Sequence, residues 1–283
     1  MALQTPRAPL GGTFELVELG HKEPLRAYLR ELWARREFVM SLSRNDLRLR
    51  HMNSVLGQAW YLVNPALNIT VYFLIFGVVF DGRRSVENYM SFLVIGVMYF
   101  RLTQSIIISC ASSMTKNIGL IRSIQFPRTL IPLSIVIENV IQFIPSALLI
   151  ILISLIDGST PGWYWLAMPV VIAVGAGISF GLGLIVARIG ASLTDLQQLL
   201  PHGFRLLLYV SGVLFSVDAR IGNPTIKRLF PLNPFYDVVA AARWSVSGRP
   251  VDLAVWVALA VWLVSSIGFG LFYFRRGEHR YGA

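Results

Sequence analysis

The 283-residue sequence has few charged side chains for its length. Charged residues make up 14% of the chain, whereas a soluble globular protein carries about 25%. Hydrophobic residues make up 55%, and the mean hydropathy is +0.61. This composition excludes a soluble protein as the default and indicates an integral membrane protein.

Cysteine and lysine are also scarce, and each scarcity excludes a kind of chemistry. Cys110 is the single cysteine, which excludes an internal disulfide and a cysteine-based metal site. None of the three lysines (Lys22, Lys116 and Lys227) follows a glycine, so the G-x-x-x-x-G-K-[ST] phosphate loop is absent. H-E-x-x-H and G-x-S-x-G are absent as well, and the four histidines are scattered. We therefore expect a non-enzymatic chain with no cofactor or metal of its own.

The net charge of +10 raises the question of nucleic acid. The basic residues flank apolar runs and do not gather on a soluble module with interleaved aromatic residues, so nucleic acid is not an expected partner. Anionic lipid headgroups are the expected partner of these residues. The first twenty residues lack an apolar core behind a basic start, so we predict no cleavable signal peptide.

Six apolar runs are long enough to cross a bilayer, at about 20 residues per crossing. They predict an all-α integral membrane protein whose six transmembrane helices lie near residues 62–80, 91–110, 130–156, 163–187, 200–217 and 253–274. With both termini in the cytoplasm, 17 Lys and Arg residues lie inside and 7 outside, which the positive-inside rule favours. The five basic residues between residues 217 and 253 argue against this orientation.

The N-terminal part divides into a tail and an amphipathic region. Residues 1–24 contain several proline and glycine residues and predict a loose cytoplasmic tail. From Leu25 to about residue 58, apolar residues including Trp33 recur at helical spacing, with arginines mostly opposite. A basic amphipathic helix of this kind lies in the headgroup layer, and packing on a soluble partner is the alternative. Residues 59–283 are the predicted transmembrane domain.

Residues 116–127 lie between the second and third apolar runs and are too polar and too short to span. Ile118, Ile121 and Ile124 fall on one side at helical spacing, and we expect Pro127 to end the helix. The segment is either a plain interfacial loop or a docking element for a soluble partner.

Two ionisable residues fall inside the predicted spans. Arg101 and Glu138 lie at similar depth near mid-membrane, because their helices run in opposite directions. Charges at that depth are costly and are usually paired or face a wet cavity. We consider two interpretations, a structural ion pair and a polar path through the membrane.

The segment at residues 232–244, before the last predicted span, is apolar enough to be buried but too short to cross the membrane. Asn233 can cap a helix, and Pro234 at the first helical position presets the backbone. We predict a short helix that re-enters the outer leaflet or caps a cavity.

Taken in order, these landmarks resemble the permease of ABC-2 type exporters that move lipid-linked polysaccharides such as O-antigen, teichoic acid and capsule. The resemblance covers about residues 25–281 and depends on short pieces: Leu56-Gly57-Gln58-Ala59-Trp60 with Asn64-Pro65, Asn117 to Leu120-Ile121 and Phe126-Pro127-Arg128 with Pro132, Asp195-Leu196 with Pro201, and Leu232-Asn233-Pro234 with Arg243. Thr194 stands where the family usually has Arg. The chain looks most like actinobacterial exporters, of which a galactan exporter is the nearest.

The resemblance implies a homodimer bound to two copies of a separate ATPase subunit, which would hold ATP and Mg. It implies a helix that couples to the ATPase, formed by Lys116, Asn117, Ile118, Leu120, Ile121, Arg122, Ile124 and Phe126. It also implies an outer gate formed by Asn233, Pro234, Phe235, Tyr236, Arg243 and Trp244. Aromatic rings suit sugars, and the candidate channel aromatics are Tyr72, Tyr99, Phe100 and Tyr209.

The function that we expect is export of a lipid-linked glycan across the plasma (inner) membrane, driven by ATP hydrolysis in a partner. An ABC-2 exporter of drugs or lipids is the alternative in the same class. A membrane-embedded glycosyltransferase is an alternative of another class, which would be expected to have paired acidic residues on a cytoplasmic loop, where Asp195 stands alone. A structural membrane scaffold is the third alternative.

Overall fold

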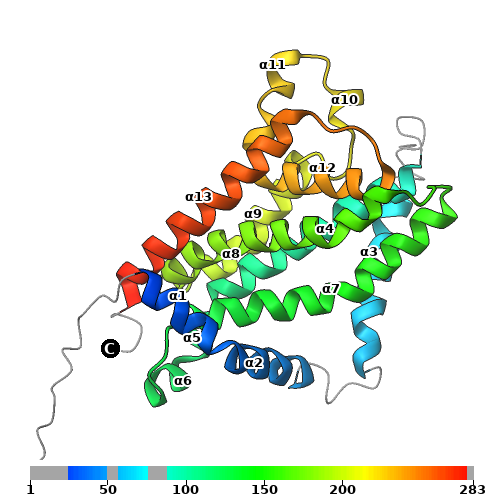
Figure 1. The fold of residues 1–283 in the computed structure, drawn as a ribbon. Coiled ribbons are helices and arrows are strands. Elements are labelled where there is room, and N and C mark those ends of the chain that lie inside the picture. Colours follow the sequence, from blue (N-terminus) through cyan, green and yellow to red (C-terminus); the bar gives the residue numbers. More distant parts are fainter. Residues whose placement is uncertain (1–24, 50–56, 76–87, 279–283) are drawn as a thin grey trace, which may run out of the picture.

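The computed structural model describes residues 25–49, 57–75 and 88–278. Within these ranges the regular secondary structure is entirely helical, and no strand is present (Figure 1). The predicted all-α class is therefore confirmed for this part of the chain. The predicted tail at 1–24, residues 50–56 of the amphipathic region and the end of the first predicted span at 76–80 lie outside the described residues.

Among the described residues, four helices are long and apolar enough to cross a membrane. They are α4 (Tyr89–Ala111), α7 (Leu130–Ile156), α8 (Met168–Ser192, preceded by the 3₁₀ turn η4, Trp163–Ala167) and α13 (Leu253–Gly277). Each has more than the roughly 20 residues that a crossing needs. They match four of the six predicted runs, and they establish a multi-pass membrane protein.

The other two runs form shorter helices. The α3 helix (Trp60–Tyr72) follows the turn η1 (Gly57–Ala59) and is apolar, but its described part ends at residue 75. The α9 helix (Leu196–Val210) has 15 residues, so the 200–217 run is not one continuous helix. The chain turns directly after α9, because Gly212 has a φ of +61°, a left-handed conformation that glycine adopts without strain.

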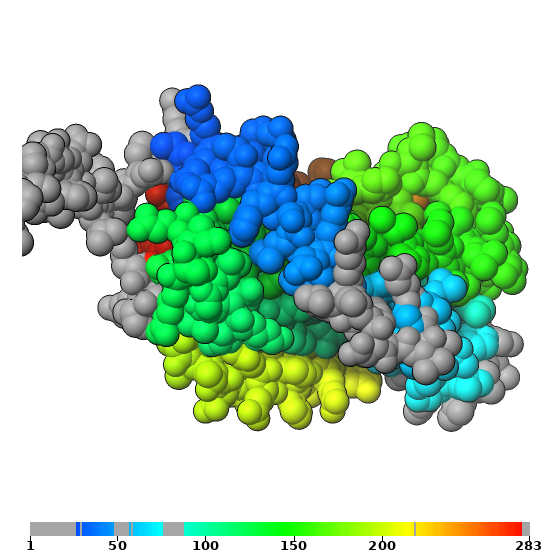
Figure 2. Space-filling model, turned by 90° about the horizontal axis from the view of Figure 1, so that it is seen from below, coloured from blue at the N-terminus to red at the C-terminus, as the bar shows by residue number. Residues whose placement is uncertain are grey.

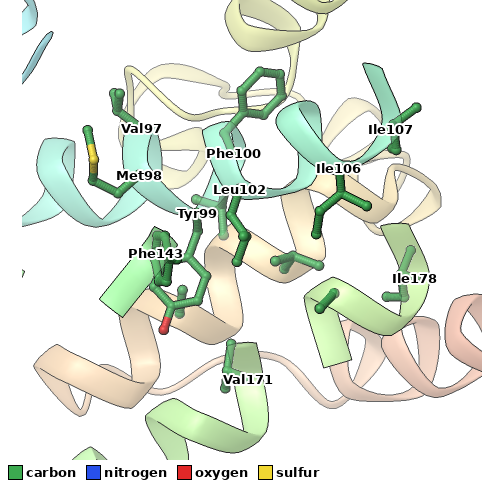
Figure 3. Close-up of a cluster of buried hydrophobic side chains, with 14 of the residues drawn as sticks. Val97, Met98, Tyr99, Phe100, Leu102, Ile106, Ile107, Phe143, Val171 and Ile178 are labelled. Atoms are coloured by element: carbon green, nitrogen blue, oxygen red, sulfur yellow. The ribbon is translucent and has the colours of Figure 1, made fainter. Parts of the chain in front are cut away.

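The α4 helix is the centre of the bundle and packs against α7, α8, α9 and α12 (Pro234–Ser247). In its most apolar stretch, 72% of the residues are buried inside the protein, against 22% in α13. Figure 3 shows side chains of α4 in a buried cluster with Phe143 of α7 and with Val171 and Ile178 of α8. The most buried of the four long helices is therefore also the one that carries Arg101.

The α8 and α13 helices approach closely through glycine. A methyl group on Gly181 would overlap the backbone of Ser266, and one on Gly270 would overlap the carbonyl of Gly181. Small residues at such crossings let backbones come close, which is how helices gain packing energy in lipid.

The amphipathic N-terminal region forms two consecutive helices, α1 (Leu25–Ala34) and α2 (Arg36–Leu49). The α2 helix lies along α7, where the Ser43 hydroxyl donates a hydrogen bond of 2.9 Å to the Ser134 carbonyl. Seen from below, α1 and α2 (blue) lie beside the green residues near 115–130 (Figure 2). This region thus packs on the protein's own bundle, and the side chain of Trp33 is 73% exposed.

Short helices close the two ends of the bundle. At one end lie α5 (Ser113–Lys116) and α6 (Ile118–Ser123), close to α1 (Figure 1). At the opposite end lie α10 (Val217–Arg220), α11 (Pro224–Lys227), the turn η5 (Phe230–Leu232) and α12. The predicted docking segment and the predicted outer gate are therefore at opposite ends of the long helices.

Candidate functional site

The α5–α6 element is a tight helical turn directly after α4. The Asn117 side chain donates a 2.9 Å hydrogen bond to the Ser113 carbonyl, and the Asn117 carbonyl accepts the first α6 bond from Ile121 N–H at 3.0 Å. Ile124 is extended, so α6 ends at Ser123, earlier than the predicted end at Pro127. Asn117 thus joins two short helices that would be unstable in isolation.

Contacts from distant parts of the chain hold this element in place. Arg35 donates a 3.0 Å hydrogen bond to the Gln125 carbonyl, and the rings of Phe38 and Phe126 have centroids 5.5 Å apart. The residues directly after α6 are therefore held against α2 and the turn that precedes it.

The three isoleucines of this element do not face the same way. Ile121 is buried at 7% exposure within the hydrophobic core, whereas Ile118 and Ile124 are 40% and 50% exposed. Lys116 and Arg122 are exposed beside them. The surface available to a partner is thus two apolar side chains with two cations.

A polar groove of about 590 Å³ lies between α3, α4 and α7. Its polar lining residues include Asn64, Arg101, Gln104, Ser105, Asn139 and Gln142. Arg101 is the thirteenth of the 23 residues of α4, so it lies near mid-helix. Its guanidinium donates a 2.7 Å hydrogen bond to the Asn68 side chain of α3.

Arg101 and Glu138 do not form an ion pair. Among the described residues an ion pair within 4.0 Å is seen between Arg35 and Glu31, and none is seen between Arg101 and Glu138. Glu138 is 2% exposed and accepts a 2.8 Å hydrogen bond from Gln142. The structural ion pair that we considered from the sequence is therefore absent from this structure.

The predicted outer gate is organised by Asn233 and Arg243. The Asn233 side-chain oxygen Oδ1 accepts the Phe235 N–H at 3.0 Å, and its side-chain Nδ2 donates to the Ser211 hydroxyl at 2.8 Å. Both the predicted cap and Pro234 at the first turn are therefore confirmed. The Arg243 guanidinium donates to the carbonyls of Phe92, Gly212 and Val213 at 3.3, 3.0 and 2.6 Å. Arg243 thereby joins α12, α4 and the turn after α9.

A cavity of about 500 Å³ lies beside Arg243. Its lining includes aromatic side chains and several basic ones. Trp244 packs edge-to-face on Trp256 at 4.9 Å and on Trp163 at 5.7 Å. Tyr236 packs on Phe230 at 5.1 Å. The residues predicted for the outer gate therefore lie together at one end of the bundle.

The four candidate channel aromatics lie in different environments. Tyr99 and Phe100 are 0% and 1% exposed; Tyr99 packs on Phe143, and Phe100 packs on Phe204 and Phe235. Buried in this way, neither ring has a free face for a sugar in this conformation. Tyr209 is 56% exposed, and Tyr72 is partly buried.

Sequence reasoning missed several polar residues that the structure brings together. Gln104, Asn139 and Gln142 line the groove with Arg101, and their positions inside apolar runs at helical spacing were the available signal. Asp237 was also missed; it is fully buried, and neither carboxylate oxygen has a hydrogen-bond partner among the described residues. Among all the residues that the structure describes, no group of three or more His, Cys, Asp or Glu side chains is placed to hold a metal ion.

The fold and these sites define a multi-pass helical membrane protein with a polar groove at membrane depth and short helices at both ends. A family model described as ABC-2 type transporter matches residues 45–247, more than half of the chain, and the chain belongs to that family. It is a permease family, and an ABC exporter permease works with an ATPase subunit.

Characterised relatives are similar over most of their length. The chain is 26% identical to the "O-antigen export system permease protein RfbA" of Myxococcus xanthus, over 75% of this chain and 81% of that protein. It is 28% and 29% identical to two proteins of the same name from Klebsiella pneumoniae, each over 64% of this chain and 70% of the relative.

Proposed function

We propose that this chain is the membrane subunit of an ABC exporter that moves a lipid-linked polysaccharide across the plasma membrane. The observation that carries the proposal is membership of the ABC-2 family together with similarity to three O-antigen export permeases. A lipid-linked glycan is the substrate class, and the sequence resemblance favours a galactan. Two copies of the chain and two ATPase subunits would form the exporter.

The proposed topology has six crossings, with α3 and α9 added to the four long helices, and both termini in the cytoplasm. The excess of basic residues on that side supports this orientation. The α3 helix is apolar, and α9 follows directly on a long helix through a short turn. Residues 1–24, 25–58 and 59–283 would then be tail, interfacial region and transmembrane domain.

In this proposal residues 116–126 dock on the ATPase, and α10–α12 form the outer gate. The exposed side chains of Ile118 and Ile124 next to two cations support a docking role, because apolar surface beside charge suits a protein interface. The tight anchoring of the element supports transmission of force. Tyr209, with its exposed ring, is the strongest of the four candidates for a channel aromatic.

Reconstitution tests the proposal directly. The chain would be purified with the ATPase that it binds and placed in vesicles containing a lipid-linked glycan, and glycan reaching the opposite leaflet would be followed with and without ATP. We expect ATP-dependent transfer that stops when the ATPase is omitted. ATP-dependent movement of small hydrophobic drugs but not of glycan would overturn the assignment of substrate class.

A further inference from the structure

The polar groove places the Arg101 cation near mid-helix, and no carboxylate of the described residues forms an ion pair with it within 4.0 Å. The Glu138 carboxylate instead accepts a hydrogen bond from Gln142. Arg101 lies 12 residues from the start of α4 and 10 from its end, roughly 18 and 15 Å at about 1.5 Å per residue. Within the described chain its side chain makes one hydrogen bond, to the neutral amide of Asn68. None of the described residues lining the groove is acidic.

An uncompensated guanidinium at this depth is costly, and such residues usually face a wet path or bind a counter-charge. The surrounding groups fit an oxyanion. Gln104 of α4 and Gln142 of α7 supply neutral amides in the same groove, and one N–H of Gln142 is donated to Glu138 at 2.8 Å. The Ser105 hydroxyl donates to Asn139 at 2.6 Å. A guanidinium presents its N–H groups as a planar fork, which matches the oxygens of a phosphate bidentately.

The groove also has an apolar wall. Met98, Leu102, Ile108 and Phe143 line it together with Trp60 and Tyr61. Its volume of about 590 Å³ is in the range of roughly 300–1,000 Å³ that small-molecule sites occupy. A ligand that satisfies both walls has an anionic head and an apolar tail.

We propose that this groove binds the phosphate linkage of the exported amphiphile, with Arg101 contacting the phosphate oxygens. The proposal rests on the proposed function, because it takes the ligand to be the lipid-linked substrate. The amides of Gln104 and Gln142 hold the remaining oxygens, and the apolar wall holds the first part of the lipid chain. Asn68 holds the guanidinium in the groove when the ligand is absent.

Binding of short-chain probes tests the chemistry. Decyl phosphate and the neutral decyl maltoside would be titrated into the full chain in nanodiscs of zwitterionic lipid, with tryptophan fluorescence as the signal and Trp60→Phe to assign it to the groove. We expect Arg101→Gln to weaken decyl phosphate binding about tenfold or more, the effect of losing one charge-assisted contact, and to leave decyl maltoside unchanged. Arg101→Lys should bind decyl phosphate with an affinity between those of wild type and Arg101→Gln, because lysine keeps the charge without the planar guanidinium.

Arg30→Gln is the matched control, since Arg30 is exposed on α1 away from the groove. Equal binding of decyl phosphate by wild type and Arg101→Gln, or equal losses for both probes, would overturn the proposal. Arg101→Lys guards against misfolding, because it preserves a positive charge and an N–H donor at this position.

Competition distinguishes the substrate from ordinary membrane lipid. We expect a polyprenyl phosphate to displace decyl phosphate at concentrations at least tenfold below those of phosphatidylglycerol. Equal displacement by both would overturn the assignment to the exported amphiphile. Absence of ATP-driven glycan export with phosphate binding intact would contradict the proposed function and leave the phosphate chemistry of the groove standing.

Discussion

Arg243 shows how this protein accommodates a cation inside its bundle without a carboxylate. Three backbone carbonyls accept its N–H groups, and the guanidinium lies over the Phe92 ring with 3.3 Å to the ring centre. Those carbonyls come from the first turn of α4 and from the turn after α9. The guanidinium therefore satisfies two carbonyls of an irregular turn, at Gly212 and Val213, and ties them to the first turn of α4.

Arg243→Lys should destabilise the protein by about 2–4 kcal/mol, because an ammonium cannot reach three carbonyls and loses the planar stacking. Thermal unfolding of the purified protein in detergent measures this as a lower midpoint. Arg228→Lys is the control, since Arg228 is exposed on the same outer segment. An unchanged midpoint for Arg243→Lys would contradict a clamping role.

Glu278 links the end of α13 to the start of α7. Its carboxylate accepts the Arg128 N–H at 2.8 Å and the Tyr28 hydroxyl at 3.4 Å. Burial raises the pKa of this carboxyl above its ordinary value of 4.5, although the Arg128 N–H opposes the shift. The folded state therefore binds more protons than the unfolded chain between the two pKa values, and stability falls as pH rises through that window.

Glu278→Gln should remove this part of the pH dependence, because glutamine keeps an acceptor for Arg128 without a charge to bury. The wild type should lose thermal stability relative to the variant as the pH rises above 4.5. The difference between the two unfolding midpoints, wild type minus variant, should therefore decrease. Exposed Glu37→Gln serves as the control and should give a flat difference. A flat difference for Glu278→Gln as well would show that burial of this carboxyl is unimportant.

Single residues were predictable from sequence where their role is local. Asn233 and Pro234 act within one helical turn, so the cap and first-turn positions could be read directly. The partner of Arg101 could not be predicted, because Asn68 lies on another helix. Whether Arg101 meets Asn68 or Glu138 depends on how each helix is rotated about its own axis.

At the scale of elements, the α8–α13 contact depends on glycine backbones in close approach. Gly181→Ala should cost about 1–3 kcal/mol, because the added methyl group overlaps the backbone of Ser266 and the helices must separate. The unfolding midpoint in detergent should fall accordingly.

Gly268→Ala on α13 is the matched control, because nothing lies within 4 Å of the added methyl group. It should leave stability unchanged or raise it by about 0.5–1 kcal/mol, since alanine favours helix over glycine. Equal effects of both substitutions would contradict glycine packing at this crossing.

The long elements were predictable from sequence and the irregular ones were not. Four apolar runs gave four long helices, because composition over 20 or more residues outweighs local detail. The prediction of one helix over residues 200–217 was wrong, because the backbone turns at Gly212. The sequence alone does not show which φ an isolated glycine in an apolar run adopts. Tertiary packing also decides that Ile121 is buried in the core while Ile118 and Ile124 are exposed, which the helical spacing did not predict.

At the scale of the whole molecule, α4 connects the two ends. Its last turn leads into α5 and α6, and the Phe92 carbonyl near its beginning is held by Arg243 of the gate helix α12. A rigid helix of 23 residues between these contacts offers a direct mechanical link. In the proposed exporter, motion at the docking element would reach the outer gate through α4.

Ile118→Asp combined with Ile124→Asp tests the docking role most directly. Both side chains are exposed, so the double substitution should preserve membrane insertion and the unfolding midpoint, whereas Ile121→Asp would place a charge in the core. Ile118→Val combined with Ile124→Val keeps the apolar surface and is the control.

The decisive measurement is ATP-driven glycan export in vesicles that contain the chain and its ATPase. We expect the double Asp variant to export at least tenfold more slowly than wild type, and the double Val variant to export at the wild-type rate. Wild-type export by the double Asp variant would contradict the proposal that a separate ATPase drives this permease through residues 116–126.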